Sequence, residues 1–225
     1  MKYLFLTAAM LVAGGVGSAR ADAFDLAASC SACHALAKPA DTSLDHAFAR
    51  KGPDLWYAGS KFKAEWLAGW LQDPKPIRAA GFPFFSNLKM GGDHDEIDTA
   101  KLAPHVKLSK ADAEEAAKAL MALTAPDLVP AGGYKGDASG ARMGAMAFNK
   151  LRGCNSCHQG EGGQGGLSGP ELTDAGARLQ PDFVAAYTAD PQRFDPHVSM
   201  PTQKLSEQDL QRLTGYLATL GSGDK

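Results

Sequence analysis

Residues 52–77 read GPDLWYAGSKFKAEWLAGWLQDPKPI, and residues 169–194 read GPELTDAGARLQPDFVAAYTADPQRF. The two stretches align without a gap at an offset of 117 residues. Most of the differing pairs are conservative, and the identical positions in the first stretch are Gly52, Pro53, Leu55, Ala58, Gly59, Ala68, Asp73 and Pro74. An internal repeat this regular indicates two copies of one structural unit.

Each copy is preceded by a short cysteine cluster, and the two clusters contain all four cysteines of the chain. Both have the pattern C-x-x-C-H, which is the attachment signal of a c-type haem. Two thiols on one helical turn reach both vinyl groups of a porphyrin, and the next residue offers its imidazole to the iron. A thioredoxin-like pair, a shared zinc site and local disulfides are the alternatives, but none explains the histidines. We therefore expect two covalently attached haem c groups, held by Cys30, Cys33, His34, Cys154, Cys157 and His158.

Residues 1–21, MKYLFLTAAMLVAGGVGSARA, have the pattern of a secretory signal. An apolar run follows Lys2, and Ala19-Arg-Ala21 matches a small-x-small cleavage site. The run is shorter than the roughly 20 apolar residues that span a bilayer. We expect cleavage after Ala21, export to the periplasm and no transmembrane segment in the mature chain. The formal net charge of −2 gives no polybasic footprint, so we expect no nucleic-acid partner.

With these motifs and the repeat, the chain resembles the class I cytochrome c family in a diheme form. In each half a short helix, C-x-x-C-H, a Gly-Pro-x-Leu loop, a middle helix, a ligand loop and a final helix follow in the family's order. The resemblance implies an all-α fold of two tandem cytochrome c domains, each enclosing one covalently bound haem, at residues 22–123 and 141–225. Residues 124–140, rich in Pro and Gly, read as the linker. The resemblance also implies that the carbonyls of Pro53 and Pro170 accept hydrogen bonds from the proximal histidines.

Helical periodicity predicts where the main elements lie. Residues 63–71 and 181–189 read as middle helices, each ended by an Asp-Pro step. Ser109 and Ser206 stand at capping positions of the final helices, with an acidic residue three positions later. No stretch shows convincing strand alternation, so we expect an almost entirely helical fold. A small-residue face suited to close helix crossing precedes the second motif, at Gly144, Ala147 and Phe148.

In the second half, Met200-Pro201 resembles the family's Met-Pro ligand loop. Met200 follows His158 by 42 residues and stands just before the capped final helix. A thioether is a neutral ligand that favours ferrous iron, and His/Met ligation therefore raises the reduction potential. We expect Met200 to be the sixth ligand of the second haem.

In the first half, the aligned ligand loop has Ala103 where the second half has Met200. His105, two residues further on, is the preferred candidate for the sixth ligand of the first haem. Met90, in a glycine-flanked stretch, is the next candidate, and His94, in acidic surroundings, is the third. An iron without a protein ligand on that side is the last alternative.

These features predict an electron-transfer cytochrome that breaks no substrate bond. Bis-histidine ligation would give the first haem the lower potential, so that electrons enter there and leave from the second haem. The partners implied are a dehydrogenase or quinol-oxidising complex as donor, and an oxidase, reductase or reaction centre as acceptor. The alternative is the haem subunit of an oxidoreductase that acts on a sulfur species or peroxide at the first haem. Whether the chain is an enzyme therefore stays open at this point.

Overall fold

The computed structural model describes residues 24–92, 96–136 and 140–222, so the expected signal segment at 1–21 and His94 lie outside it. The described chain is mostly helical with few strands, which agrees with the helical part of the predicted fold class. Short 3-10 turns connect the main helices, and a π-helical turn, η4 (Ala147–Leu151), continues from α6. The α-helices are α1 (Leu26–Cys30), α2 (Leu44–Ala49), α3 (Ala58–Lys61), α4 (Ala64–Gln72), α5 (Lys110–Met121), α6 (Ala141–Met146), α7 (Ala175–Arg178), α8 (Pro181–Ala189) and α9 (Glu207–Thr219). The 3-10 turns are η1 (Phe84–Asn87), η2 (Thr99–Lys101), η5 (Cys154–Ser156), η6 (Glu161–Gly163) and η7 (Pro191–Arg193).

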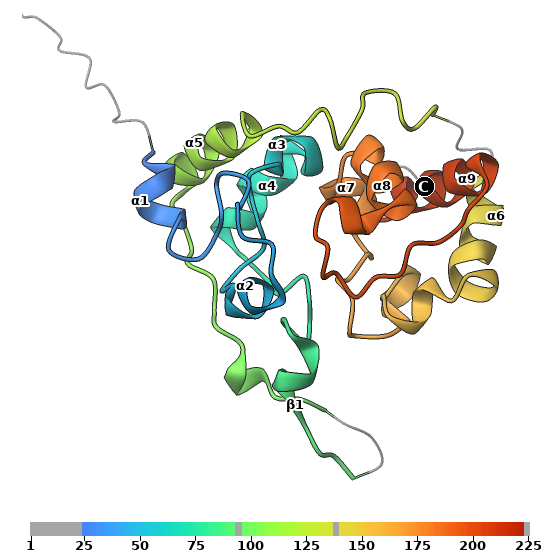
Figure 1. The fold of residues 1–225 in the computed structure, drawn as a ribbon, viewed down its shortest axis with the longest axis horizontal. Coiled ribbons are helices and arrows are strands. Elements are labelled where there is room, and N and C mark those ends of the chain that lie inside the picture. The colour runs from blue at the N-terminus through green and yellow to red at the C-terminus, as the bar shows by residue number, and fades with distance from the viewer. Residues whose placement is uncertain (1–23, 93–95, 137–139, 223–225) are drawn as a thin grey trace, which may run out of the picture.

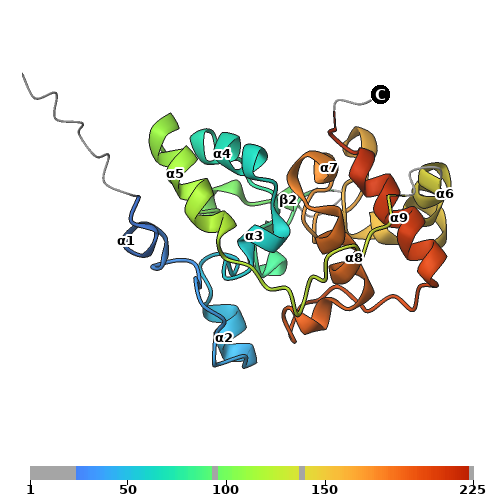
Figure 2. The same cartoon turned by 90° about the horizontal axis from the view of Figure 1, so that it is seen from above.

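Helices α1 to α5 form one lobe, residues 24–123, and α6 to α9 form a second lobe, residues 140–222 (Figure 1). Between them, residues 124–136 run along one side of the molecule (Figure 2). This segment is anchored to both lobes. The Ala125 amide donates to Ser60 Oγ at 2.9 Å, and the Tyr134 amide donates to Asp182 Oδ1 at 2.8 Å. The connecting segment therefore contacts both lobes through hydrogen bonds, in addition to linking them covalently.

Local sequence explains the ends of the main helices. The side chain of Ser109 accepts from the Asp112 amide at the start of α5, and Ser206 accepts from the Asp209 amide at the start of α9. These are the two predicted N-caps. The middle helices α4 and α8 end against Asp73 and Asp190, as the two Asp-Pro steps predict.

Each lobe is built on one helix crossing, with α4 on α5 in the first lobe and α6 on α9 in the second. At the second crossing, a Cβ added to Gly144 would lie 2.1 Å from the carbonyl oxygen of Arg212. Only glycine permits this approach, and Phe148 is buried beside it at 1% exposure. The predicted small-residue face is therefore confirmed as a close helix contact.

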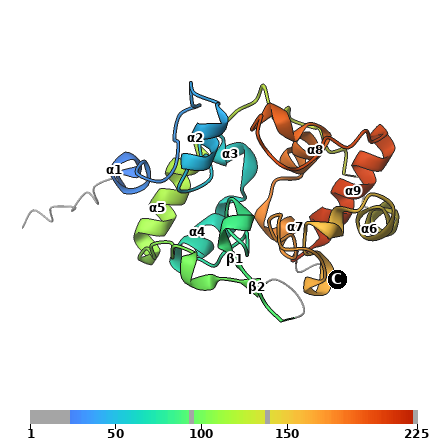
Figure 3. The same cartoon turned by 60° about the horizontal axis from the view of Figure 1, so that its bottom comes forward.

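One short hairpin departs from the helical prediction. Strand β1 (Leu88–Lys89) pairs in antiparallel fashion with β2 (Glu96–Ile97). The hairpin projects from the first lobe (Figures 1 and 3). Alternation is a signal over four residues or more, and strands of two residues are too short to carry it.

The two lobes meet through a set of reciprocal contacts between repeat-equivalent residues. Phe62 and Leu179, which align at the offset of 117, form an isolated antiparallel bridge. The Lys63 amide donates to the Arg178 carbonyl at 2.9 Å, and the Gln180 amide donates to the Lys61 carbonyl at the same distance. Residues of the two aligned stretches thus face each other, and each lobe uses the same surface to bind the other. Such a self-complementary contact is the kind that a two-fold axis generates.

The side chains along this interface repeat the same reciprocity. Lys63 Nζ donates to the Gly176 carbonyl at 2.6 Å, and its counterpart Gln180 donates to the carbonyl of Gly59. Trp66 Nε1 donates to Asp174 Oδ2 at 3.0 Å, and their counterparts Phe183 and Tyr57 stack with ring centroids 6.1 Å apart. Side-chain hydrogen bonds and an aromatic stack therefore join the two lobes, in addition to the backbone hydrogen bonds.

Candidate functional site

The two C-x-x-C-H motifs adopt the same local conformation. In each, the histidine amide donates to the carbonyl of the first cysteine at 3.0 Å, which closes a helical turn. None of the four cysteines, all within the described chain, forms a disulfide. The first cysteine of each motif is half-buried and the second is exposed, and burial raises the pKa of the Cys30 and Cys154 thiols. The two thiols of each motif thus stand on one turn, directly before the histidine.

Both motif histidines are oriented by a proline carbonyl. His34 Nδ1 donates to Pro53 O at 2.7 Å, and His158 Nδ1 donates to Pro170 O at 2.7 Å. A carbonyl can only accept, so the Nδ1 atom of each ring carries the proton and Nε2 keeps its lone pair. Burial also lowers the pKa of both rings, which favours the neutral form that binds a metal.

A glycine beside each ring makes room for this arrangement. A Cβ added to Gly52 would lie 2.5 Å from His34 Cε1, and one added to Gly169 would lie 2.6 Å from His158 Cε1. A side chain at either position would displace the imidazole. In each repeat, the glycine therefore leaves space for the neighbouring histidine ring, and the proline carbonyl orients that ring.

The exposed side chain of His105 lies close to His34 in the first lobe. Their ring centroids are 6.1 Å apart, with an angle of 46° between the ring planes. His105 Nδ1 donates to the Val106 carbonyl at 2.8 Å, and the ring packs edge-on against Trp70 at 4.8 Å between centroids. Its Nε2 is therefore the nitrogen that keeps a lone pair, as in His34.

The spacing of these two rings can be compared with that of a shared iron. Metal–imidazole bonds are about 2 Å long, so two rings that shared one metal would have centroids about 6 Å apart. The ring centroids of His34 and His105 are 6.1 Å apart, which is close to this value.

The other candidates for the first lobe stand differently. Met90 directly follows strand β1 of the projecting hairpin and is 93% exposed. His94 lies outside the described residues. Ala103, which aligns with Met200, is exposed in the segment that leads to α5.

In the second lobe, Met200 is half-buried on the loop between η7 and α9. Its carbonyl oxygen accepts from Gln192 Nε2 at 2.9 Å, and Gln192 Oε1 accepts in turn from the Thr202 hydroxyl. One glutamine side chain thus contacts the backbone before Pro201 and the threonine side chain after it.

Cationic side chains gather where the lobes meet. Lys61 Nζ lies over the rings of Phe62, Tyr57 and Phe183, at 4.9 to 5.8 Å from their centroids. Burial, with smaller effects from Arg178 and Arg78, lowers the pKa of Lys61 to about 8. The Arg178 side chain is 3% exposed, and its Nε has no hydrogen-bond partner in the described chain, although Asp174 Oδ1 lies 3.5 Å away.

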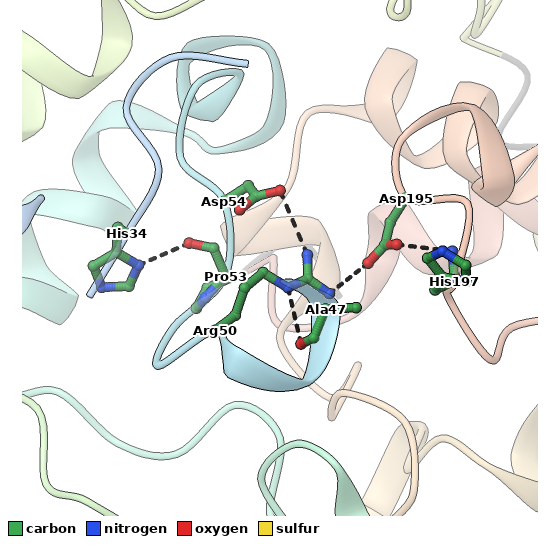
Figure 4. A network of polar contacts seen from close by, with 7 residues as sticks. All are labelled: His34, Ala47, Arg50, Pro53, Asp54, Asp195 and His197. Carbon is green, nitrogen blue, oxygen red and sulfur yellow. Dashed lines mark hydrogen bonds and ion pairs between the residues drawn. The ribbon is translucent and has the colours of Figure 1, made fainter. Parts of the chain in front are cut away.

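One polar cluster is not predicted by the sequence motifs. Arg50 links Asp54 of its own lobe to Asp195 of the other, and this network reaches Pro53 and His34 (Figure 4). The segment that contains Arg50 differs in length between the two repeats. Gly52 follows His34 by 18 residues, whereas the equivalent Gly169 follows the second motif's histidine by only 11, and the surplus in the first lobe holds helix α2.

Two further findings concern membrane spans and clusters of metal-ligating side chains. Within the described residues, no helix is both long and apolar enough to cross a membrane. No three His, Cys, Asp or Glu side chains of the described chain lie together as a possible set of metal ligands.

Comparison with known families gives one match. The family model described as Cytochrome c matches residues 141–221, which is the second lobe almost from end to end. No curated protein and no solved structure matches the chain. The match supports a c-type cytochrome and implies covalently bound haem c, a role in electron transfer and redox partners.

Proposed function

We propose that this chain, whose residues 141–221 match the cytochrome c family, is an exported diheme c-type cytochrome that transfers single electrons between redox partners. One observation carries the proposal. The 2.7 Å histidine–proline hydrogen bond beside the C-x-x-C-H motif of the matched lobe recurs at the same length beside the motif of the first lobe. Two motifs with the same oriented histidine support one haem in each lobe.

The residues of the first lobe fit such a group. Cys30 and Cys33 would bind it covalently, and His34 would be the proximal ligand. The ring spacing of 6.1 Å and the free Nε2 atoms support His105 as the ligand on the opposite side. In the second lobe the haem would be bound covalently by Cys154 and Cys157. Its iron would be held by His158 as the proximal ligand and by Met200 as the sixth ligand.

Two cationic side chains between the lobes, Lys61 and Arg178, also fit a bound haem. Each haem carries propionate carboxylates, and a buried cation is stabilised by an opposite charge. Lys61 Nζ packs over aromatic rings, and Arg178 leaves Nε without a hydrogen bond in the described chain. These two side chains occupy equivalent positions of the repeat. We propose that they neutralise propionates in the loaded protein.

The haem iron supplies the redox chemistry by alternating between the ferric and ferrous states. The chain sets the potential through its ligands, and a bis-histidine pair lowers it relative to His/Met. His34 and His105 would therefore hold the first iron at the lower potential, and His158 with Met200 would hold the second at the higher one. This order gives electron entry at the first lobe and exit at the second.

The contact between the lobes supports electron exchange within one chain. The Glu171 amide, next to Pro170, donates to the Ile77 carbonyl at 2.6 Å, and Arg78 Nη1 donates to the Ser168 carbonyl at 2.9 Å. On the other side, Asp54, next to Pro53, is linked through Arg50 to the second lobe. Both Gly-Pro loops, which orient the motif histidines, therefore lie at the interface.

The donor and acceptor follow from this class of protein. We propose a dehydrogenase or quinol-oxidising complex as donor and an oxidase, reductase or reaction centre as acceptor, with export to the periplasm. The alternative of an oxidoreductase for a small inorganic substrate requires a first iron that is open on one side. The spacing of the His34 and His105 rings supports a first iron that is closed on that side.

Haem content and ligand access test the proposal. The purified protein should contain two haems per chain in the pyridine haemochrome assay, and neither reduced haem should bind carbon monoxide rapidly. One haem per chain would contradict the diheme proposal. Rapid binding of carbon monoxide at one of two haems would favour the oxidoreductase alternative.

A further inference from the structure

One arginine joins the surroundings of the two metal sites. Arg50, the C-cap residue of α2, extends its guanidinium between two carboxylates from different lobes (Figure 4). Nη2 lies 2.6 Å from Asp195 Oδ2, and Nη1 lies 3.4 Å from Asp54 Oδ2. The side chains of Arg50, Asp54 and Asp195 are 18%, 11% and 22% exposed, so solvent screens this cluster only in part.

One end of this network leads to the first motif histidine. Asp54 directly follows Pro53, whose carbonyl orients the His34 ring. Burial is the main influence on the pKa of His34 and lowers it, while the negative charge of Asp54 acts in the opposite direction. The charge of Asp54 is therefore felt at the ring that would hold the first iron.

The other end leads to the ligand loop of the second lobe. Asp195 Oδ1 accepts from the His197 amide at 2.9 Å, and the Asp195 carbonyl accepts from the Val198 amide at 3.1 Å. These bonds form a tight turn that begins five residues before Met200. A carboxylate at the base of this loop is thus held by an arginine from the opposite lobe.

We propose that Arg50 is a positioning residue that links the base of the Met200 loop to the first redox centre, so that the charge of Asp195 changes the potential of the iron held by His34. The inference rests on the proposed diheme function. Two carboxylates share one guanidinium, and the shorter contact shows that Asp195 holds it more closely than Asp54 does.

The physical basis is competition for the cation. When Asp195 no longer binds Arg50, the planar guanidinium can form a bidentate ion pair with Asp54. Asp54 is then neutralised more completely, and the negative field at His34 weakens. A weaker negative field disfavours the ferric state, so the potential of the first haem rises.

A double-mutant cycle on the haem-loaded protein tests this coupling. Asp195→Asn removes the charge in the second lobe, and the potential of the first haem is followed by a redox titration monitored by electron paramagnetic resonance. We expect Asp195→Asn to raise this potential in the wild-type background and to have little effect in the Arg50→Gln background. Glu207→Gln is the matched control, because it removes an exposed carboxylate that pairs with Lys135, and it should leave the first haem unchanged in both backgrounds.

Equal shifts in the two backgrounds would overturn the coupling, because the effect would then act through space without Arg50. No shift in either background would overturn it as well. If Arg50→Gln binds less haem, Arg50→Lys replaces it, since one ammonium cannot hold two carboxylates in a fork and the shift should again shrink. Failure of the diheme proposal is seen separately, as a single haem per chain before any titration begins.

Discussion

The ring centroids of His34 and His105 lie 6.1 Å apart, although 71 positions separate the two residues in the sequence. Each ring donates from Nδ1 to a backbone carbonyl, at 2.7 Å for His34 and 2.8 Å for His105. Both Nε2 atoms are therefore left as lone-pair donors. This pairing supports a bis-histidine iron in the first lobe and an unequal pair of potentials in one chain.

Removing one pair of motif cysteines should remove one haem. The double variant Cys30→Ala/Cys33→Ala should bind half the haem of the wild type, because the first lobe loses both covalent attachments. The matched variant Cys154→Ala/Cys157→Ala should lose the other half. Pyridine haemochrome assays on both proteins measure this directly, and an unchanged haem content in either one would count against a haem in that lobe.

The two candidate methionines should behave differently. Met200→Ala should abolish the thioether-to-iron charge-transfer band of the ferric protein and lower the potential of the second haem, because a neutral soft ligand is lost. Met90→Ala is the control and should leave the band intact, since Met90 is 93% exposed beside the projecting hairpin. Loss of absorption at this band in Met90→Ala would show that Met90 is an iron ligand after all.

Two glycine substitutions should change stability in opposite directions. Gly144→Ala should cost about 1–3 kcal/mol in the free energy of unfolding, because its Cβ would meet the Arg212 carbonyl at 2.1 Å. Gly69→Ala, inside α4, meets nothing within 4 Å and should gain about 0.5–1 kcal/mol, since alanine is the better helix former.

Denaturant unfolding followed by circular dichroism compares the two glycine variants with the wild type. A neutral Gly144→Ala would mean that α6 can move away from α9 at little cost. Such a result would contradict the claim that the crossing of α6 and α9 requires glycine at position 144.

The sequence predicted the elements whose signals are local. The middle helix at 181–189 was placed at the bounds of α8, and the one at 63–71 lies within one residue of α4, because Asp-Pro steps and apolar spacing act over a single turn. The capping serines were found for the same reason. Strands β1 and β2 were missed because two residues show no alternation.

Contacts between distant residues could not be read in the same way. The repeat predicted two similar units, but it did not reveal that the repeated stretches face each other through Phe62 and Leu179. Nor did it reveal that Arg50 reaches Asp195, 145 positions away. Such pairs depend on how the lobes pack, and a single sequence contains no local mark of that packing.

The ligand set of the first iron is the central claim, and low-temperature electron paramagnetic resonance of the ferric protein tests it most directly. Wild-type protein should show two low-spin haems with different signals, one of bis-histidine type and one of His/Met type. His105→Ala should convert the bis-histidine signal to high spin or to a new ligand, and should leave the His/Met signal unchanged. An unaltered spectrum in His105→Ala would contradict the account, because another group would then be the sixth ligand of the first haem.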